Sequence, residues 1–155
     1  MLHSVHRLAL CLGLGLALLV SPVEARAPRR KVVWSSVVVP AARKDQARLE
    51  ATLKQVLEEE GKKARWGKRG AEAVEASLDL RQFTTTIHGD IAHISCAATG
   101  KIKGFGPVKS RFSFGGSAAG QAALEKHVLG ILARGIIQRL AEMARSQDEG
   151  WKVTH

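Results

Sequence analysis

Three consecutive segments of the chain alternate apolar and polar residues, which is the pattern of β-strands that bury one face and expose the other. Two turn sequences, HGD at 88–90 and KGFG at 103–106, separate them. Because both turns are short, the three strands are predicted to form an antiparallel meander. The residues expected on the shared face are Val74, Ala76, Leu78 and Leu80, then Ala92, Ile94, Cys96 and Ala98, then Val108, Ser110, Phe112 and Phe114.

Two other segments repeat apolar residues every three or four positions, as amphipathic helices do. The first runs from Ala41 to Glu60, and Gly61 is its expected stop. The second follows the sequence GGSAAG at 115–120, interpreted as a flexible connector, and is apolar around much of its circumference from Leu124 to Met143. Its polar stripe is narrow and consists of His127, Arg134, Gln138, Glu142 and Arg145.

The stretch from Lys31 to Val39 holds five valines and Trp34 and ends at Pro40. It is too short for a helix, so it is predicted to be a buried strand. The order of elements predicts an α+β two-layer sandwich, β-α-β-β-β-α. In it, the first strand joins the meander and both helices pack on one face. This domain is expected over 31–146, after a basic linker at 26–30 and before a carboxy-terminal tail at 147–155 in which Trp151 packs back.

The first 25 residues have the three zones of a secretory signal peptide. Arg7 precedes an apolar run from Leu8 to Val20, and small residues lie near Ala25. The run is shorter than the roughly 20 residues that cross a bilayer. We therefore expect cleavage near Ala25, no transmembrane anchor afterwards, and a periplasmic or secreted protein. Cys11 lies inside the apolar run, which does not fit a lipidation site.

The chain has 155 residues, and its 24 lysines and arginines against 14 acidic residues give a net charge of +10. Its apolar share of 45% is typical of a soluble domain and excludes wholesale disorder. An exported basic protein is expected to meet lipid head groups, lipopolysaccharide or acidic glycans. Each surface cation then contributes on the order of 1 kcal/mol. Nucleic acid ranks below these partners, and basicity that serves solubility alone is the competing interpretation.

Three segments hold most of the excess positive charge: 29–31, 62–69 and 101–111. The second is predicted to be a loop, and its Trp66 either anchors at a membrane or sugar surface or folds over the preceding helix end. The candidate binding residues are Lys62, Lys63, Arg65, Trp66, Lys68 and Arg69.

Little else in the sequence points to chemistry. His88, Asp90 and His93 lie close enough together to suggest a metal or acid–base site, but turn chemistry and a solvated histidine explain them as well. The glycine-rich stretches match neither a phosphate loop nor a dinucleotide fingerprint. No catalytic residue, metal ligand or cofactor is therefore assigned.

Cys96 is the one cysteine that remains after the leader, so an internal disulfide is excluded. It is expected to be a small buried residue, or else a reactive or intermolecular thiol. His93, three positions away on a strand, points to the other face and cannot serve as its base.

The valine run before Pro40, the following helix, the meander around Cys96 and the connector before the last helix resemble small exported envelope domains. The pattern is similar to the amino-terminal α/β domain of Tol-Pal translocation proteins and to lipoproteins that activate penicillin-binding proteins. This architectural resemblance spans roughly Lys31 to Arg145, without a diagnostic motif or a lipid-attachment cysteine, and it carries over no site residue. It implies a non-catalytic domain that docks onto another envelope protein.

Three hypotheses follow. The leading one is an exported, non-catalytic interaction module of the bacterial cell envelope that binds an envelope protein or an anionic surface through basic loops. The second is a small metal-dependent or hydrolytic enzyme that uses His88, Asp90 and His93. The third is a homo-oligomeric structural subunit, motivated by the wide apolar face of the helix from Leu124 to Met143.

Overall fold

The computed structural model describes residues 28–41, 44–148 and 150. The predicted signal peptide, its cleavage site and Trp151 lie outside these residues. The elements are β1 (Val32–Val38), α1 (Gln46–Lys63), β2 (Val74–His88), β3 (Ile91–Ile102), β4 (Val108–Ser117), a 3₁₀ turn (Ala118–Gly120) and α2 (Gln121–Asp148). Their order confirms the predicted sequence β-α-β-β-β-α.

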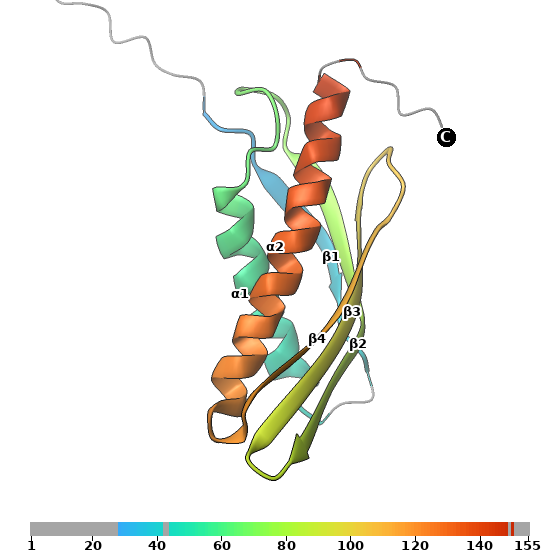
Figure 1. Cartoon of the computed structure of the whole chain (residues 1–155). Helices are drawn as coiled ribbons and strands as arrows, with labels where there is room; N and C mark the ends of the chain where they lie inside the picture. The colour runs from blue at the N-terminus through green and yellow to red at the C-terminus, as the bar shows by residue number, and fades with distance from the viewer. Residues whose placement is uncertain (1–27, 42–43, 149, 151–155) are drawn as a thin grey trace, which may run out of the picture.

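The four strands form one sheet in the order β1-β2-β3-β4. β1 runs parallel to β2, whereas β2, β3 and β4 pair antiparallel in the predicted meander (Figure 1). The β2–β3 hairpin closes at Gly89, whose φ of 57° lies in the left-handed region that glycine adopts without strain.

Both helices lie on the same face of the sheet (Figure 1). α2 packs against β3 and β4, and α1 packs against α2 and the edge strand β1. The predicted two-layer α+β sandwich is thus confirmed. The wide apolar face of α2 is buried between the sheet and α1, so the feature that suggested a homo-oligomer is accounted for within the chain.

The prediction that the valine run is a buried strand is wrong. β1 is an edge strand with one face toward the helices and the other toward solvent, and Val33 and Val38 are half exposed. A bulge at Ser35 shifts the register, so Trp34 and Val37 both face the helix layer although they are three residues apart.

Gly61 does not end α1, which begins at Gln46 and continues to Lys63. The glycine is buried in the last turn, and a Cβ there would lie 3.0 Å from Val32 Cγ1. Its role is therefore close packing of α1 on β1 rather than termination of the helix.

The stretch 115–120 is also not the flexible connector that its composition predicts. Gly115 and Gly116 belong to β4 and pair with His93 and Ala92 of β3. A Cβ at Gly116 would lie 2.7 Å from Leu124, so glycine here allows the first turn of α2 to approach the sheet.

Neither α1 nor α2, the two helices of the described region, is long and apolar enough to cross a membrane.

Candidate functional site

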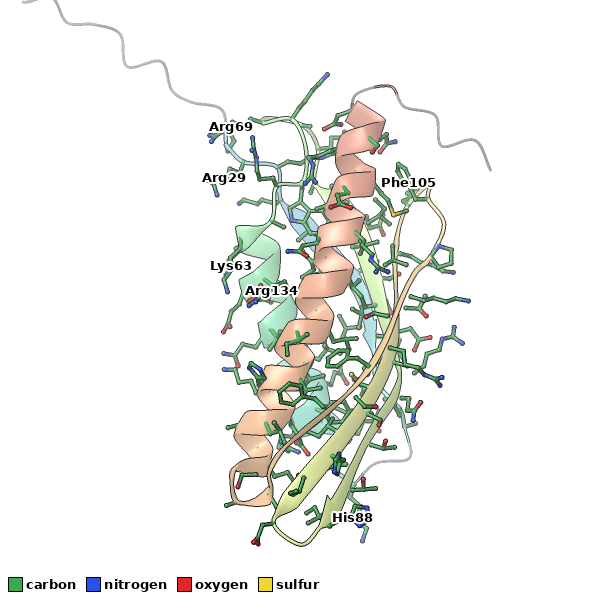
Figure 2. The ribbon with its side chains drawn as sticks, viewed as in Figure 1. Arg29, Lys63, Arg69, His88, Phe105 and Arg134 are labelled. Carbon is green, nitrogen blue, oxygen red and sulfur yellow. The ribbon has the colours of Figure 1, made fainter. Side chains whose placement is uncertain are left out.

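Two basic segments that are distant in sequence meet at one end of the molecule. The amide of Gly70 donates to the carbonyl of Pro28 at 3.1 Å, and the amide of Val74 donates to that of Lys31 at 2.8 Å. These bonds bring segment 28–31 alongside the loop after α1. Arg29, Lys63 and Arg69 gather there, while His88 lies at the opposite end (Figure 2). We call 28–31 and 62–72 together the basic end.

Arg30 fixes the backbone of the basic end. Its guanidinium donates to both carboxylate oxygens of Asp148 at 3.1 and 3.3 Å, to the Trp66 carbonyl at 3.3 Å and to the Glu72 carbonyl at 2.6 Å. Asp148 also accepts the Lys68 amide at 2.7 Å. Arg30 was expected in a linker, but its side chain is only 13% exposed and ties the loop to α2. The loop is therefore held in one shape.

The loop uses backbone groups for these bonds, which leaves its cationic heads at the surface. Arg65 gives its carbonyl to Arg145 at 2.7 Å, and Lys68 gives its amide to Asp148. Among the described residues, no ion pair engages the side chains of Arg29, Lys31, Lys62, Arg65 or Lys68, all of which are exposed. Lys63 differs, because it contacts Glu60 at 2.7 Å.

Glu60 joins the two helices beside the basic end. It accepts from Arg134 of α2 at 3.0 and 3.3 Å and from Lys63 of α1. Hydrogen bonds from Arg134 and then from Lys63 lower the pKa of Glu60 to about 2. The carboxylate is therefore charged at neutral pH, and it pairs with Lys63 and Arg134 rather than with the other cations of the basic end.

Trp66 is not available as a contact residue. Its side chain is 2% exposed, and its indole Nε1 donates to the carbonyl of Gly61 at 2.8 Å. The tryptophan thus folds over the end of α1, as the competing interpretation had it. The other five candidates, Lys62, Lys63, Arg65, Lys68 and Arg69, are exposed at the basic end.

The third basic segment lies elsewhere, on the face of the sheet that carries no helix. Lys101, Lys109 and Arg111 occupy outward positions of β3 and β4 and, with Arg81, line a shallow hollow of about 600 Å³. The structure therefore separates the excess charge into two surfaces rather than one.

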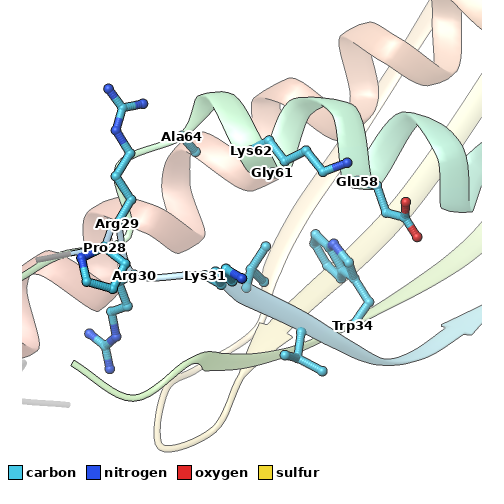
Figure 3. Close-up of a pocket in the computed structure, with 11 residues that line it drawn as sticks. Pro28, Arg29, Arg30, Lys31, Trp34, Glu58, Gly61, Lys62 and Ala64 are labelled. Atoms are coloured by element: carbon cyan, nitrogen blue, oxygen red, sulfur yellow. The ribbon is translucent and has the colours of Figure 1, made fainter. Parts of the chain in front are cut away.

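A groove lies between β1 and the carboxyl-terminal half of α1 (Figure 3). It has a volume of about 600 Å³, and we call it the β1 groove. Val32 and Trp34 form its apolar floor, and Glu58 lines it from α1. It is bounded by residues of the basic end: Arg29, Arg30, Lys31 and Lys62. This groove was not predicted from the sequence, although an uncharged valine run beside a cluster of cations is a sign of it.

Trp34 carries an unusual polar atom. Its indole Nε1 is buried and has no hydrogen-bond acceptor among the described residues. A buried donor left in this way costs about 1–3 kcal/mol, so most such groups in proteins find a partner.

The histidine hypothesis does not assemble a site. His88 and His93 lie with ring centroids 6.3 Å apart, and no group of three His, Cys, Asp or Glu residues within the described ranges could hold a metal ion. The three residues instead occupy the exposed β2–β3 hairpin, as turn chemistry predicts.

Cys96 lies in the core of β3 at 1% exposure. Burial raises the pKa of its thiol to about 11, against a smaller lowering by a backbone hydrogen bond from Phe112. The thiol itself donates to the Phe112 carbonyl at 3.7 Å. Since the thiolate is the nucleophile, this residue is unreactive in the folded protein. The interpretation as a small buried residue is confirmed.

One buried charge was not predicted from the sequence. Glu125 of α2 is 2% exposed and accepts from Arg48 of α1 at 2.7 Å, Gln121 at 2.9 Å and Thr85 of β2 at 3.2 Å. Burial raises the pKa of Glu125, but these hydrogen bonds outweigh burial, so the pKa lies below its ordinary value. The network is satisfied within the fold, which indicates a structural role.

Comparisons with known proteins add a likeness of fold alone. No protein-family model matches the chain, and no curated protein does. A minor lipoprotein from Acinetobacter baumannii has a TM-score of 0.40 and 16% identity, over 72% of this chain and 94% of that one. A "putative lipoprotein" from Caulobacter crescentus CB15 has a TM-score of 0.42 and 10% identity, over 74% and 92% of the two chains. At these TM-scores the likeness carries no argument about function.

Proposed function

We propose that this protein is an exported, non-catalytic interaction module of the bacterial cell envelope. Its basic end binds an anionic envelope component: lipid head groups, lipopolysaccharide phosphates, an acidic glycan or a protein that presents such groups. The signal-peptide pattern of the first 25 residues supports export. The observation that carries the binding proposal is the joining of two basic segments on a loop that Arg30 and Asp148 tie to α2.

The arrangement favours surface binding over catalysis for two physical reasons. The backbone that carries these unneutralised cations is already held by hydrogen bonds, so little backbone entropy is lost when they meet phosphates or carboxylates. In addition, Cys96 is buried, and the exposed His88 and His93 belong to no group of three His, Cys, Asp or Glu residues within the described ranges that could hold a metal ion.

The test measures co-sedimentation of the purified protein with vesicles that contain anionic phospholipid, at low and high salt. The double variant Arg65→Gln/Lys68→Gln removes two exposed cations and keeps their backbone bonds. It should lose about 2 kcal/mol of binding free energy, or roughly a 30-fold drop in affinity at low salt. The dependence of binding on salt should flatten in parallel.

The matched control is Lys101→Gln/Lys109→Gln, which removes the same charge from the other basic surface of the molecule. If both double variants lose affinity equally, net charge rather than the basic end drives binding, and the proposal is wrong. Parallel sedimentation with isolated cell envelopes identifies the component. Retention that survives high salt with one protein enriched would instead indicate shape-specific docking on that protein.

A further inference from the structure

The edge strand β1 lacks the charged side chains that commonly protect an edge against pairing, although a bulge at Ser35 interrupts its ladder with β2. Its sequence, VVWSSVV, contains no ionisable side chain, and Val33 and Val38 are half exposed. The other edge strand, β4, carries Lys109 and Arg111. Natural edge strands commonly bear charges because an apolar, uncharged edge recruits another strand. Within the described residues β1 pairs with β2 alone, so no strand of that part of the chain pairs with its other edge.

The space beside this edge has the shape of an extended chain. The β1 groove begins at Pro28, and a second hollow of about 210 Å³ continues it through Trp34 to Val37. Strand residues rise about 3.3 Å each, so the seven residues of β1 span about 23 Å. A peptide of six or seven residues would match that length.

The lining suits alternating side chains. Val32, Trp34 and Val37 are partly buried against the core and offer apolar surface. Trp34 lines both hollows, so its ring offers apolar surface along their length, whereas its Nε1 is buried and is not a contact for a peptide. A strand added to an edge supplies apolar side chains for such a surface and main-chain groups for the edge itself.

Charge along the groove has a direction. Arg29, Lys31 and Lys62 surround the end at Pro28, whereas Glu58 and Lys54 lie further along. An acidic group is therefore favoured at the first end and a neutral segment beyond it. This complementarity distinguishes the occupant from a second copy of β1, which is uncharged throughout.

We propose that the β1 groove binds an extended segment of another protein, which adds to the sheet as a strand beside β1. The segment is acidic at one end and consists of β-branched residues beyond it. This binding goes beyond the proposed attachment to anionic surfaces, and it uses Lys31 and Lys62 rather than Arg65 and Lys68.

The test titrates the purified protein with three synthetic peptides while tryptophan fluorescence is recorded. The first is acetyl-Asp-Glu-Val-Thr-Val-Thr-Val-amide; the second has two lysines in place of the acidic pair; the third has proline at the central valine. We expect micromolar binding of the first peptide and affinities at least tenfold weaker for the other two. Proline cannot donate a main-chain hydrogen bond, so its effect isolates strand pairing. Trp34→Phe should remove most of the fluorescence change.

Two variants distinguish the cations of the basic end that line the β1 groove, Lys31 and Lys62, from those that do not, Arg65 and Lys68. Lys31→Gln/Lys62→Gln should weaken the first peptide at least tenfold. Arg65→Gln/Lys68→Gln should leave peptide binding unchanged while it weakens vesicle binding. The two proposals can therefore fail independently.

Amide hydrogen exchange distinguishes main-chain pairing with β1 from side-chain contacts alone. The amides of Val33–Val38 that do not bond β2 should exchange at least tenfold more slowly with the first peptide bound. Equal binding of the proline peptide, or unchanged exchange, would overturn strand addition and leave only electrostatic attraction. A concentration-dependent dimer that protects β1 without peptide would assign the edge to a second copy. Binding of decanoate without binding of the peptide would assign the groove to an acyl chain.

Discussion

At the scale of single residues, the buried carboxylate of Glu125 is the clearest case of a charge held in place by its neighbours. Arg48, Gln121 and Thr85 come from both helices and from β2, and each donates to it. Hydrogen bonds to a charged group contribute about 1.5–3 kcal/mol each when the group is buried. The network thus links the first turn of each helix to the sheet.

We predict that Glu125→Gln lowers the free energy of unfolding by about 1–3 kcal/mol at pH 7. The pKa of Glu125 is lower in the folded chain than in the unfolded chain. Its contribution to stability is therefore complete above the ordinary carboxyl pKa and is lost as the pH falls through the lowered value. Urea unfolding at several pH values should show the variant and the parent converging in acid. The control Glu142→Gln, at an exposed position of α2, should change stability by less than about 0.5 kcal/mol. A difference that stays constant down to pH 3 would contradict the role of the charge.

Single residues also show which contacts cannot be predicted from a sequence. Trp34 and Trp66 are similar in a list of residues, yet one lines a groove with an unpartnered N–H and the other caps a helix from inside the core. Glu125 sits in an otherwise apolar stripe, and periodicity alone does not reveal that Arg48 arrives from another helix. Hydrogen-bond partners that are 40 or 77 residues apart follow only from the fold.

At the scale of elements, glycine determines how closely α2 can lie on the sheet. A Cβ at Gly100 of β3 would overlap Ile136 Cγ2 and approach Leu140 to 3.2 Å. By contrast, nothing lies within 4 Å of a Cβ at Gly130 within α2. The two glycines therefore have opposite reasons to be present.

We predict opposite signs for the same substitution at these two positions. Gly100→Ala should destabilise the protein by about 1–3 kcal/mol, because a tightly packed interface must move apart. Gly130→Ala should stabilise it by about 0.5–1 kcal/mol, because alanine favours a helix and meets no neighbour. Guanidinium unfolding of both variants measures the difference. Equal effects of the same sign would show that helix propensity and packing at this interface do not account for stability.

The elements themselves were largely predictable, because alternation and helical periodicity report which face is buried. The four strands, two helices and their layering were predicted from positions such as Leu78, Ile94 and Leu53. The wrong predictions concern glycines and valines whose role is to let another helix or strand pack closely. In the sequence Gly61 and Gly116 look like a helix stop and part of a flexible connector, but in the structure they permit close contacts with Val32 and Leu124. The position of β1 at the sheet edge likewise depends on the order of strands, which local pattern does not encode.

At the scale of the whole molecule, folding gathers positive charges that are spread along the sequence into separate surfaces. Segments 28–31 and 62–72 precede β1 and β2. Because these two strands run parallel, both begin at the same end of the sheet, and the two segments therefore form one surface. The exposed β2–β3 hairpin lies at the opposite end (Figure 2). An anionic layer that attracts the basic end would therefore leave the hairpin pointing away from that layer.

The described residues also share one hydrophobic core, and Cys96 can report on it as a unit. The core extends from Leu49 of α1 to Ala144 of α2 and includes Cys96 of the central strand β3. With its pKa raised to about 11 and its side chain 1% exposed, the thiol should react only when this core opens.

We predict that iodoacetamide labels Cys96 at least about 1,000-fold more slowly in the native protein than in denaturant, as expected for a domain stable by 5 kcal/mol or more. Mass spectrometry of the Cys96 peptide along a urea series should give a midpoint that coincides with that from circular dichroism, because one core unfolds in one transition. Labelling that precedes the loss of helix signal would mean that β3 and β4 separate before the helices unfold, and that the sheet and the helix layer are not one cooperative unit.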